Sequence, residues 1–170
     1  YCNLLDSQRF VCDAPEGRMR FGRHPQGDLL LQSSRIAAEA VLLEDTARAV
    51  ELYSEVFGEY PRDTLSVVEA DFLDGMEYDG LYFLSKGFYN LYDGTPNGYL
   101  TAIAVHETAH QWWYGLVGND QAQEPWLDEA LCTFSERVYY ERFYPEALSA
   151  WWQPYRVNYY EPRGLVGNSV

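Results

Sequence analysis

Two histidines four positions apart, His106 and His110, are the residues of this chain whose spacing most directly suggests chemistry. They enclose Glu107 in the sequence His-Glu-Thr-Ala-His. Positions four apart on a helix lie on one face about a turn apart, so two imidazole nitrogens can converge on one metal ion. Glu107 is poorly placed to be a third ligand, but it can reach a water in the open coordination position. The motif predicts a zinc site, one Zn²⁺ per chain, with Glu107 as the general base.

A third protein ligand must come from another segment, because a catalytic zinc has three protein ligands and one open position. Glu129, which eighteen residues separate from His110, is the candidate, and an intervening turn would let its helix fold back on the first. Asp128 and Glu124 compete with Glu129 on charge alone. Residue spacing and charge alone leave the choice among these three acids open.

Other residues near the motif allow two interpretations each. Glu136, seven residues after Glu129, falls near the same helix face, where it could accept the spare imidazole N–H of a ligand histidine. An ion pair between Glu136 and Arg137 is the alternative. The aromatic run at residues 112–114 either packs in the core or contacts substrate, and core packing is favoured.

The three cysteines lack the CxxC spacing of a thiolate zinc cluster or a redox pair. Buried or free thiols are expected, and a disulfide between Cys2 and Cys12 is the alternative.

The elements that would position these residues follow from periodicity and stop signals. Apolar residues at helical spacing predict a helix over residues 34–57. Strand-forming residues at 65–72 and 78–85 predict two neighbouring strands, with the sequence Gly-Met-Glu-Tyr between them on a strand edge. The zinc motif lies in a helix expected from Tyr99 to Tyr114, with Gly115 as its stop.

The second half of the site is expected on a further helix. Pro125 near its first position, acids in its first turn and Arg142 in its last predict a helix that Pro145 follows. Residues 146–160 could continue as helix, but Pro154 is expected to kink or end it.

Composition excludes several classes of protein. The 170 residues, 47% of them hydrophobic, can bury one sizeable core, and the chain has 26 acidic against 12 basic residues. Because the acids are scattered over periodic segments, nucleic acid is not an expected partner. No run approaches the roughly 18 apolar residues of a membrane span. The start at Tyr1 and the end at Val170 suggest a piece of a longer protein.

The combination of motifs resembles the zinc aminopeptidases of family M1, which belong to the thermolysin-like gluzincins. The matching residues are His-Glu-Thr-Ala-His-Gln-Trp-Trp-Tyr-Gly, the spacing of Glu129 within Glu-Pro-Trp-Leu-Asp-Glu-Ala, and Gly75-Met76-Glu77 upstream. The resemblance runs from about residue 35 to residue 141. It implies that His106, His110 and Glu129 are ligands and that Glu107 is the base.

The resemblance also implies a substrate site at Gly75, Met76 and Glu77. The family pattern Gly-x-Met-Glu-Asn forms an edge strand whose backbone pairs with the peptide and whose Glu holds the free α-amino group. Here Tyr78 replaces the Asn and the residue between Gly and Met is absent. A carboxylate fixed near the metal can bind an ammonium group on chemical grounds alone. A solvated turn carboxylate is the other interpretation of Glu77.

The expected fold is therefore α+β and thermolysin-like, a small mixed sheet with an edge strand over a helical half. Residues 1–34 form an irregular or short-strand segment, and residues 35–170 form the metallopeptidase domain, incomplete at its C-terminal end. In the family a Tyr some sixty residues after the glutamate ligand stabilises the oxyanion, and here it would fall past Val170. The expected function is zinc-dependent peptide hydrolysis, with an aminopeptidase favoured. An endopeptidase with the same triad and a noncatalytic zinc- or peptide-binding fragment are the alternatives.

Overall fold

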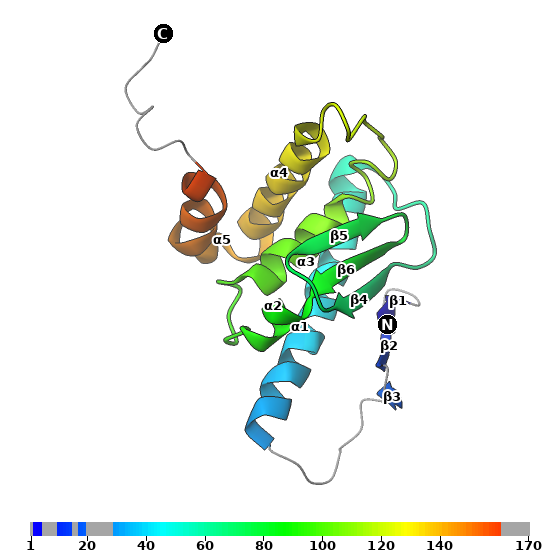
Figure 1. Ribbon diagram of the computed structural model, residues 1–170. Coiled ribbons are helices and arrows are strands. Elements are labelled where there is room, and N and C mark those ends of the chain that lie inside the picture. Colours follow the sequence, from blue (N-terminus) through cyan, green and yellow to red (C-terminus); the bar gives the residue numbers. More distant parts are fainter. Residues whose placement is uncertain (1, 5–9, 15–16, 20–28, 161–170) are drawn as a thin grey trace.

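A computed structural model shows a mixed α+β fold in which one sheet lies against a set of helices (Figure 1). The structure describes residues 2–4, 10–14, 17–19 and 29–160, with side chains for residues 35–159. The α+β class predicted from the sequence is confirmed. Among the described residues no helix is both long and apolar enough to cross a membrane.

The sheet has the strand order β3-β2-β1-β4-β6-β5. Its strands are β1 (Cys2–Leu4), β2 (Phe10–Ala14), β3 (Gly17–Met19), β4 (Ser66–Ala70), β5 (Gly75–Tyr78) and β6 (Leu81–Ser85). The two predicted strands at 65–72 and 78–85 are the neighbours β4 and β6, which run parallel. The segment between them is a strand of its own, β5, antiparallel to β6 and at the edge of the sheet.

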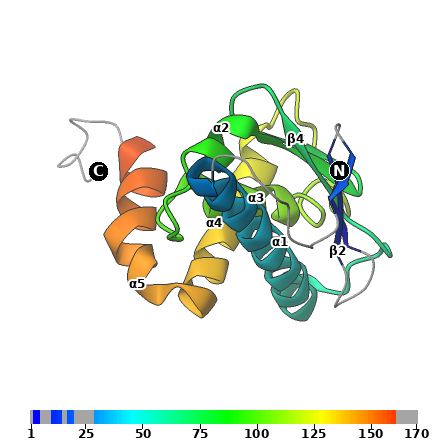
Figure 2. The ribbon, with the colours of Figure 1, turned by 90° about the horizontal axis from the view of Figure 1, so that it is seen from below.

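Helix α1 (Leu29–Phe57) begins five residues before the predicted helix and ends where the sequence predicts. It packs on α3 (Tyr99–Ala109), and α3 packs on α4 (Trp126–Phe143) (Figure 2). One apolar cluster joins α1, α3 and α4, and a second joins α1 and α3 to β4 and β6. Every residue of α3 from Leu100 to Ala109 is buried, because both clusters meet on this helix. The zinc motif thus lies in the core of the protein.

Helix α3 is shorter than predicted, since it ends at Ala109 rather than Tyr114. His110 still has helical dihedral angles, but the next amides bond three or four residues back in tight turns, as Gln111 N–H does to the Thr108 carbonyl. Tyr114 then takes a positive φ of 96°. A Cβ on Gly115 would lie 2.5 Å from the Gln111 carbonyl oxygen, so this turn needs glycine.

The C-terminal helices bring a second departure from the prediction. Helix α2 (Lys86–Asn90) precedes α3, and α4 is followed by the short α5 (Pro145–Ala147). The chain continues as a π-helix, η1 (Leu148–Val157), and as the 3₁₀ turn η2 (Asn158–Tyr160). Pro154 neither ends nor interrupts η1. The wider π-helical turn, with bonds five residues apart, accommodates the ring that an α-helical interior would exclude.

Of the three cysteine side chains, the structure describes that of Cys132 alone. Cys132 on α4 is a free, buried thiol, as expected. The sheet register places Cys2 opposite Cys12 on β1 and β2. The side chains of Cys2 and Cys12 lie outside the described residues, so neither the expected thiols nor the alternative disulfide is tested there.

Candidate metal centre

The two histidines of the motif converge on one carboxylate of the neighbouring helix. Nε2 of His106 lies 3.0 Å from Glu129 Oε2, and Nε2 of His110 lies 3.8 Å from Glu129 Oε1. Both histidines are buried, whereas the Glu129 side chain is about half exposed. His106 lies in the last turn of α3, His110 directly follows that helix, and the first turn of α4 carries Glu129.

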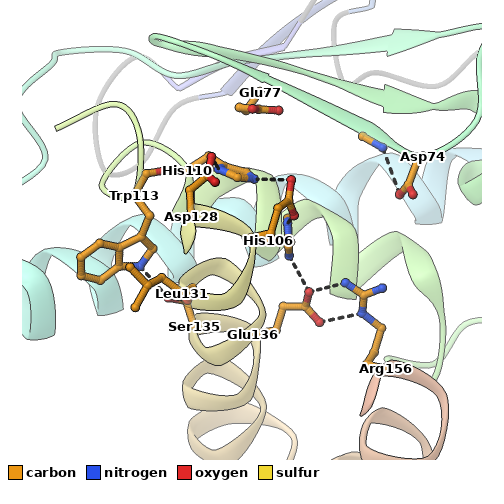
Figure 3. A network of polar contacts seen from close by, with 12 residues as sticks. Asp74, Glu77, His106, His110, Trp113, Asp128, Leu131, Ser135, Glu136 and Arg156 are labelled. Atoms are coloured by element: carbon orange, nitrogen blue, oxygen red, sulfur yellow. Dashed lines mark hydrogen bonds and ion pairs between the residues drawn. The ribbon is translucent and has the colours of Figure 1, made fainter. Parts of the chain in front are cut away.

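The other nitrogen of each histidine is engaged on the opposite side of its ring. His106 Nδ1 lies 2.7 Å from Glu136 Oε1, and His110 Nδ1 donates to the Trp113 carbonyl at 3.2 Å. Figure 3 shows Glu136 between His106 and Arg156. Because Nδ1 of each ring is held by an acceptor, the Nε2 atoms are the ones directed towards Glu129.

The donor set fits zinc in type and spacing. At zinc–ligand distances of about 2.0–2.2 Å, a tetrahedral arrangement places neighbouring donor atoms roughly 3.4 Å apart. The two distances to Glu129, 3.0 Å from His106 Nε2 to Oε2 and 3.8 Å from His110 Nε2 to Oε1, are each close to that value, although they join different oxygens. A cation there would take the place of the proton between His106 and Glu129. Imidazole nitrogen and carboxylate oxygen are ordinary zinc donors.

The competing acids are less well placed. Asp128 is buried, and its nearer oxygen lies 3.9 Å from His110 Nδ1, the nitrogen that bonds to Trp113. Its oxygens accept hydrogen bonds from Gln121 and Asn119. Glu124 is exposed. Geometry therefore favours Glu129 over both.

Cys132 is a candidate ligand that sequence spacing could not suggest. Its sulfur comes within 4.8 Å of ligating atoms of His106 and His110. Burial raises the pKa of the Cys132 thiol far above its ordinary value, and four carboxylates around it raise it further. A thiol must lose its proton to bind zinc, so Glu129 is the better third donor.

Charge around the motif is dominated by acids. Burial lowers the pKa of His106, but its hydrogen bonds to Glu129 and Glu136 and nearby negative charges raise it to about 10. Burial and the charge of His106 lower the pKa of His110. The hydrogen bond from His106 lowers the pKa of Glu129. A cation is thus favoured between the histidines and Glu129.

Glu107 lies beside this site with an unused oxygen. It is 5% exposed, and its Oε2 has no hydrogen-bond partner among the described residues. Burial raises its pKa to about 8; the charge of His106 opposes that rise, and Glu77 and Glu129 add to it. A buried carboxylate oxygen without a donor needs a partner that the described protein groups do not supply.

Strand β5 lies directly over Glu107. Alternation along the strand turns Gly75 and Glu77 inwards and the side chains of Met76 and Tyr78 outwards. A Cβ on Gly75 would come within 2.1 Å of Glu107 Oε1. Any other residue at position 75 would therefore displace the Glu107 carboxylate.

Two glutamines hold this strand, and sequence reasoning gave neither a role. Gln111, fully buried, donates from Nε2 to the Tyr78 carbonyl at 2.9 Å and accepts from Gly80 N–H at 2.8 Å. Gln121 donates to Glu77 Oε1 at 2.9 Å and to Asp128 at 2.6 Å. The only signal for Gln111 was its place next to His110, and Gln121 lies in an irregular loop without a local signal.

The aromatic run after the motif belongs mainly to the core. Trp112 is buried and donates to the Gly58 carbonyl at 2.7 Å. Trp113 packs at the edge of the helical cluster and donates to Ser135 at 2.9 Å. Tyr114 remains partly exposed.

Comparison with known proteins bears on the whole arrangement. The model of the peptidase family M1 domain matches residues 41–164, which is most of the chain and includes every candidate site residue named in this section. No solved structure matches the chain significantly. The family match spans the histidine motif, β5 and the two helices that carry the candidate ligands, so the chain belongs to peptidase family M1, a family of zinc metallopeptidases.

Proposed function

We propose that this chain carries the catalytic centre of a zinc aminopeptidase, with zinc bound by His106, His110 and Glu129. The observation that carries the proposal is the convergence of both Nε2 atoms on the two oxygens of Glu129, at 3.0 and 3.8 Å. When bound, zinc would supply Lewis-acid polarisation of the scissile carbonyl and lower the pKa of a coordinated water.

Glu107 is the proposed general base. Its Oε2 is buried and without a partner, and Gly75 leaves room for the carboxylate beside β5. Glu107 accepts the proton of the attacking water as the new C–O bond forms. It then donates that proton to the nitrogen of the leaving amine as the C–N bond breaks.

Strand β5 is the proposed docking edge for the peptide. On its outer side it has no partner among the described strands, so a substrate in extended conformation can pair with the backbone of Gly75 and Met76. The Met76 side chain points away from Glu107, so only its backbone is assigned to substrate.

Glu77 is the proposed anchor for the substrate's α-ammonium group. Its side chain faces the same side as Gly75, and Gln121 holds Oε1 while Oε2 stays available. An anchor at a fixed distance from Glu107 limits cleavage to the first peptide bond. That anchor distinguishes the aminopeptidase from an endopeptidase with the same ligands.

The remaining features of the proposal concern the wider architecture. The sheet over the helical half is proposed to have the thermolysin-like arrangement, with residues 35–170 as the catalytic domain and residues 1–34 as an N-terminal segment. Strand β1 of that segment pairs with β4, and α1 begins within the segment at Leu29.

Metal analysis tests the ligand set. The 170-residue chain should bind one zinc, and His110→Ala should abolish binding, whereas His24→Ala, which replaces the histidine outside the motif, should leave it unchanged. Full zinc content in the His110→Ala variant would reject the proposed site.

Kinetics test the base. In a preparation with measurable peptidase activity, Glu107→Gln should keep zinc and lose roughly two to four orders of magnitude in kcat. Gly75→Ala should also keep zinc but lower kcat, because the added methyl group displaces Glu107. Near-normal turnover in Glu107→Gln would remove this residue from the mechanism.

Blocked substrates test the anchor. Peptides with a free N-terminus should be cleaved much faster than their acetylated forms, and Glu77→Ala should slow only the former, by a charge-assisted contact of about 1.5–3 kcal/mol. Equal cleavage of free and acetylated peptides would make the protein an endopeptidase. Zinc binding without turnover of either peptide would indicate a noncatalytic fragment.

A further inference from the structure

The carboxylate of Glu136 receives four hydrogen bonds, and only one of them comes from His106. Oε1 accepts from His106 Nδ1 at 2.7 Å and from the Arg156 guanidinium at 2.5 Å. Oε2 accepts from Trp152 Nε1 at 2.8 Å and from Arg156 Nε at 2.9 Å. Glu136 is fully buried, so these donors define its position completely.

Arg156 and Trp152 both belong to η1, the π-helical segment that packs on α4. Arg156 reaches both oxygens of Glu136, and such a two-point contact fixes the plane of a carboxylate as well as its place. Trp152 is itself buried in the helical core cluster, which fixes the direction of its N–H. The segment therefore delivers two fixed donors to Glu136, of which Figure 3 shows Arg156.

We infer that Arg156 and Trp152 are positioning residues for the zinc ligand His106, acting through Glu136. The inference rests on the proposed function. Arg156 and Trp152 orient the carboxylate, the carboxylate orients the imidazole through Nδ1, and the imidazole then directs Nε2 to the metal. Residues 148–157 are thereby part of the metal centre although none of them contacts zinc.

The placement of the cluster argues for more than a role in stability. A buried ion pair contributes little net stability compared with well-packed apolar residues of similar volume. If the contact between Arg156 and Glu136 served only to join η1 to α4, Glu136 would not also need to accept a hydrogen bond from the candidate ligand His106. Polar partners behind a ligand histidine raise metal affinity by holding ring orientation and tautomer.

Zinc affinity of the 170-residue chain, measured by competition with a chromogenic chelator, tests the inference. Arg156→Met should weaken zinc binding about 10- to 100-fold, the range for loss of such outer partners. Arg156→Lys keeps the charge without the two-point contact and should recover part of the loss. Trp152→Phe removes one donor and keeps the ring, and should give a smaller loss. Arg137→Met, which breaks only the exposed pair with Glu141, should bind zinc as the wild type does.

Two further measurements separate orientation from general loss of structure. Co²⁺ substituted for zinc should show an altered visible absorption spectrum in the Arg156 and Trp152 variants, because the ligand field depends on how His106 is oriented. Leu65→Ala weakens the sheet-side core cluster, which does not include Glu136, and its folded form should keep wild-type affinity and spectrum.

The outcomes distinguish the two levels of proposal. A wild-type chain that binds no zinc would overturn the proposed function and this inference together. A wild-type chain that binds zinc, with unchanged affinity and spectrum in folded Arg156→Met and Trp152→Phe, would overturn only the inference.

Discussion

Two buried carboxylates, Glu136 and Asp45, join helices of this protein, and they differ in the groups that bind them. Glu136 on α4 is bound by Arg156 and by His106 as well as by an indole. Asp45 on α1 is bound by hydroxyl groups, from Thr101 on α3 and from two tyrosines after or within α4, Tyr139 and Tyr144, each at 2.8 Å. Both carboxylates are almost completely buried.

The difference shows what a cation does for a buried acid. Burial raises the pKa of Asp45, and neither its three hydroxyl donors nor the charge of Arg48, which pairs directly with Glu44, offsets that effect. Burial would raise the pKa of Glu136 too, but the hydrogen bonds of Arg156 and His106 lower it below its ordinary value. Glu136 is thus a fixed negative charge beside the metal centre. Asp45 connects α1, α3 and α4 through its hydrogen bonds, and burial disfavours its ionised form.

The largest expected effect is on the stability of the protein with chelator present. Glu136→Gln should cost about 3–5 kcal/mol in the free energy of unfolding, because it removes the negative charge that Glu136 presents to the part-buried Arg156 and to the buried His106. Asp45→Asn should cost only about 1 kcal/mol, since hydroxyl groups can turn to accept from the new amide. Urea denaturation measures both. Equal losses of stability in the two variants would mean that the cations bound to Glu136 do not change the cost of removing its charge.

The next effect concerns zinc itself. Saturating zinc should raise the free energy of unfolding of wild type and Asp45→Asn equally, because only the folded state binds it tightly. The rise should be smaller in Glu136→Gln by about 1.4–2.7 kcal/mol, which corresponds to a 10- to 100-fold loss in affinity. The measurement is urea denaturation at a buffered free zinc concentration. A reduced rise in Asp45→Asn would contradict the separation of the two carboxylates.

The pH dependence should single out Asp45. Because its folded pKa lies above its ordinary value of 3.8, the folded state holds more protons than the unfolded state between the two values. The contribution of Asp45 is then fully present below the unfolded pKa and is lost as pH rises through the folded pKa, by at most about 1.4 kcal/mol per pH unit.

The difference between wild type and Asp45→Asn isolates this contribution, since the other acids cancel. The charged or titratable groups that interact with Asp45 are the same in both proteins: Arg48, Tyr82, Tyr92, Tyr139, Tyr140 and Tyr144. The stability of wild type relative to Asp45→Asn should fall as pH rises. A relative stability that increases with pH would show that the folded pKa of Asp45 is lowered.

The sequence predicts which residues form the candidate metal site because that information is local. The spacing of His106 and His110 depends only on helical periodicity. Helix α1 is predicted from the spacing of apolar residues, and α4 from its flanking prolines, first-turn acids and Arg142. The edge position of Gly75 to Tyr78 follows from the resemblance and from strand alternation.

What the sequence could not predict depends on contacts distant along the chain. Arg156 reaches Glu136 through a π-helix that passes Pro154, where local rules predict a kink or an end. The end of α3 at Ala109 depends on turns that place Tyr114 at a positive φ. Cys132 approaches the histidines only because α4 packs on α3.

The smallest expected effect on stability comes from removing one hydrogen-bond donor of Asp45. Tyr144→Phe removes one of the three hydroxyls from Asp45 and should cost about 0.5–1.5 kcal/mol in the free energy of unfolding, because Thr101 and Tyr139 still bind the carboxylate. Zinc affinity should not change, since no contact of Asp45 ends on a candidate ligand. Tyr155→Phe, at a half-exposed tyrosine, is the control and should alter neither quantity. Trp152→Phe likewise removes one donor from a buried acid, Glu136, and is expected to weaken zinc binding. A comparable loss of zinc affinity in Tyr144→Phe would show that Asp45 belongs to the metal centre and does not only join helices.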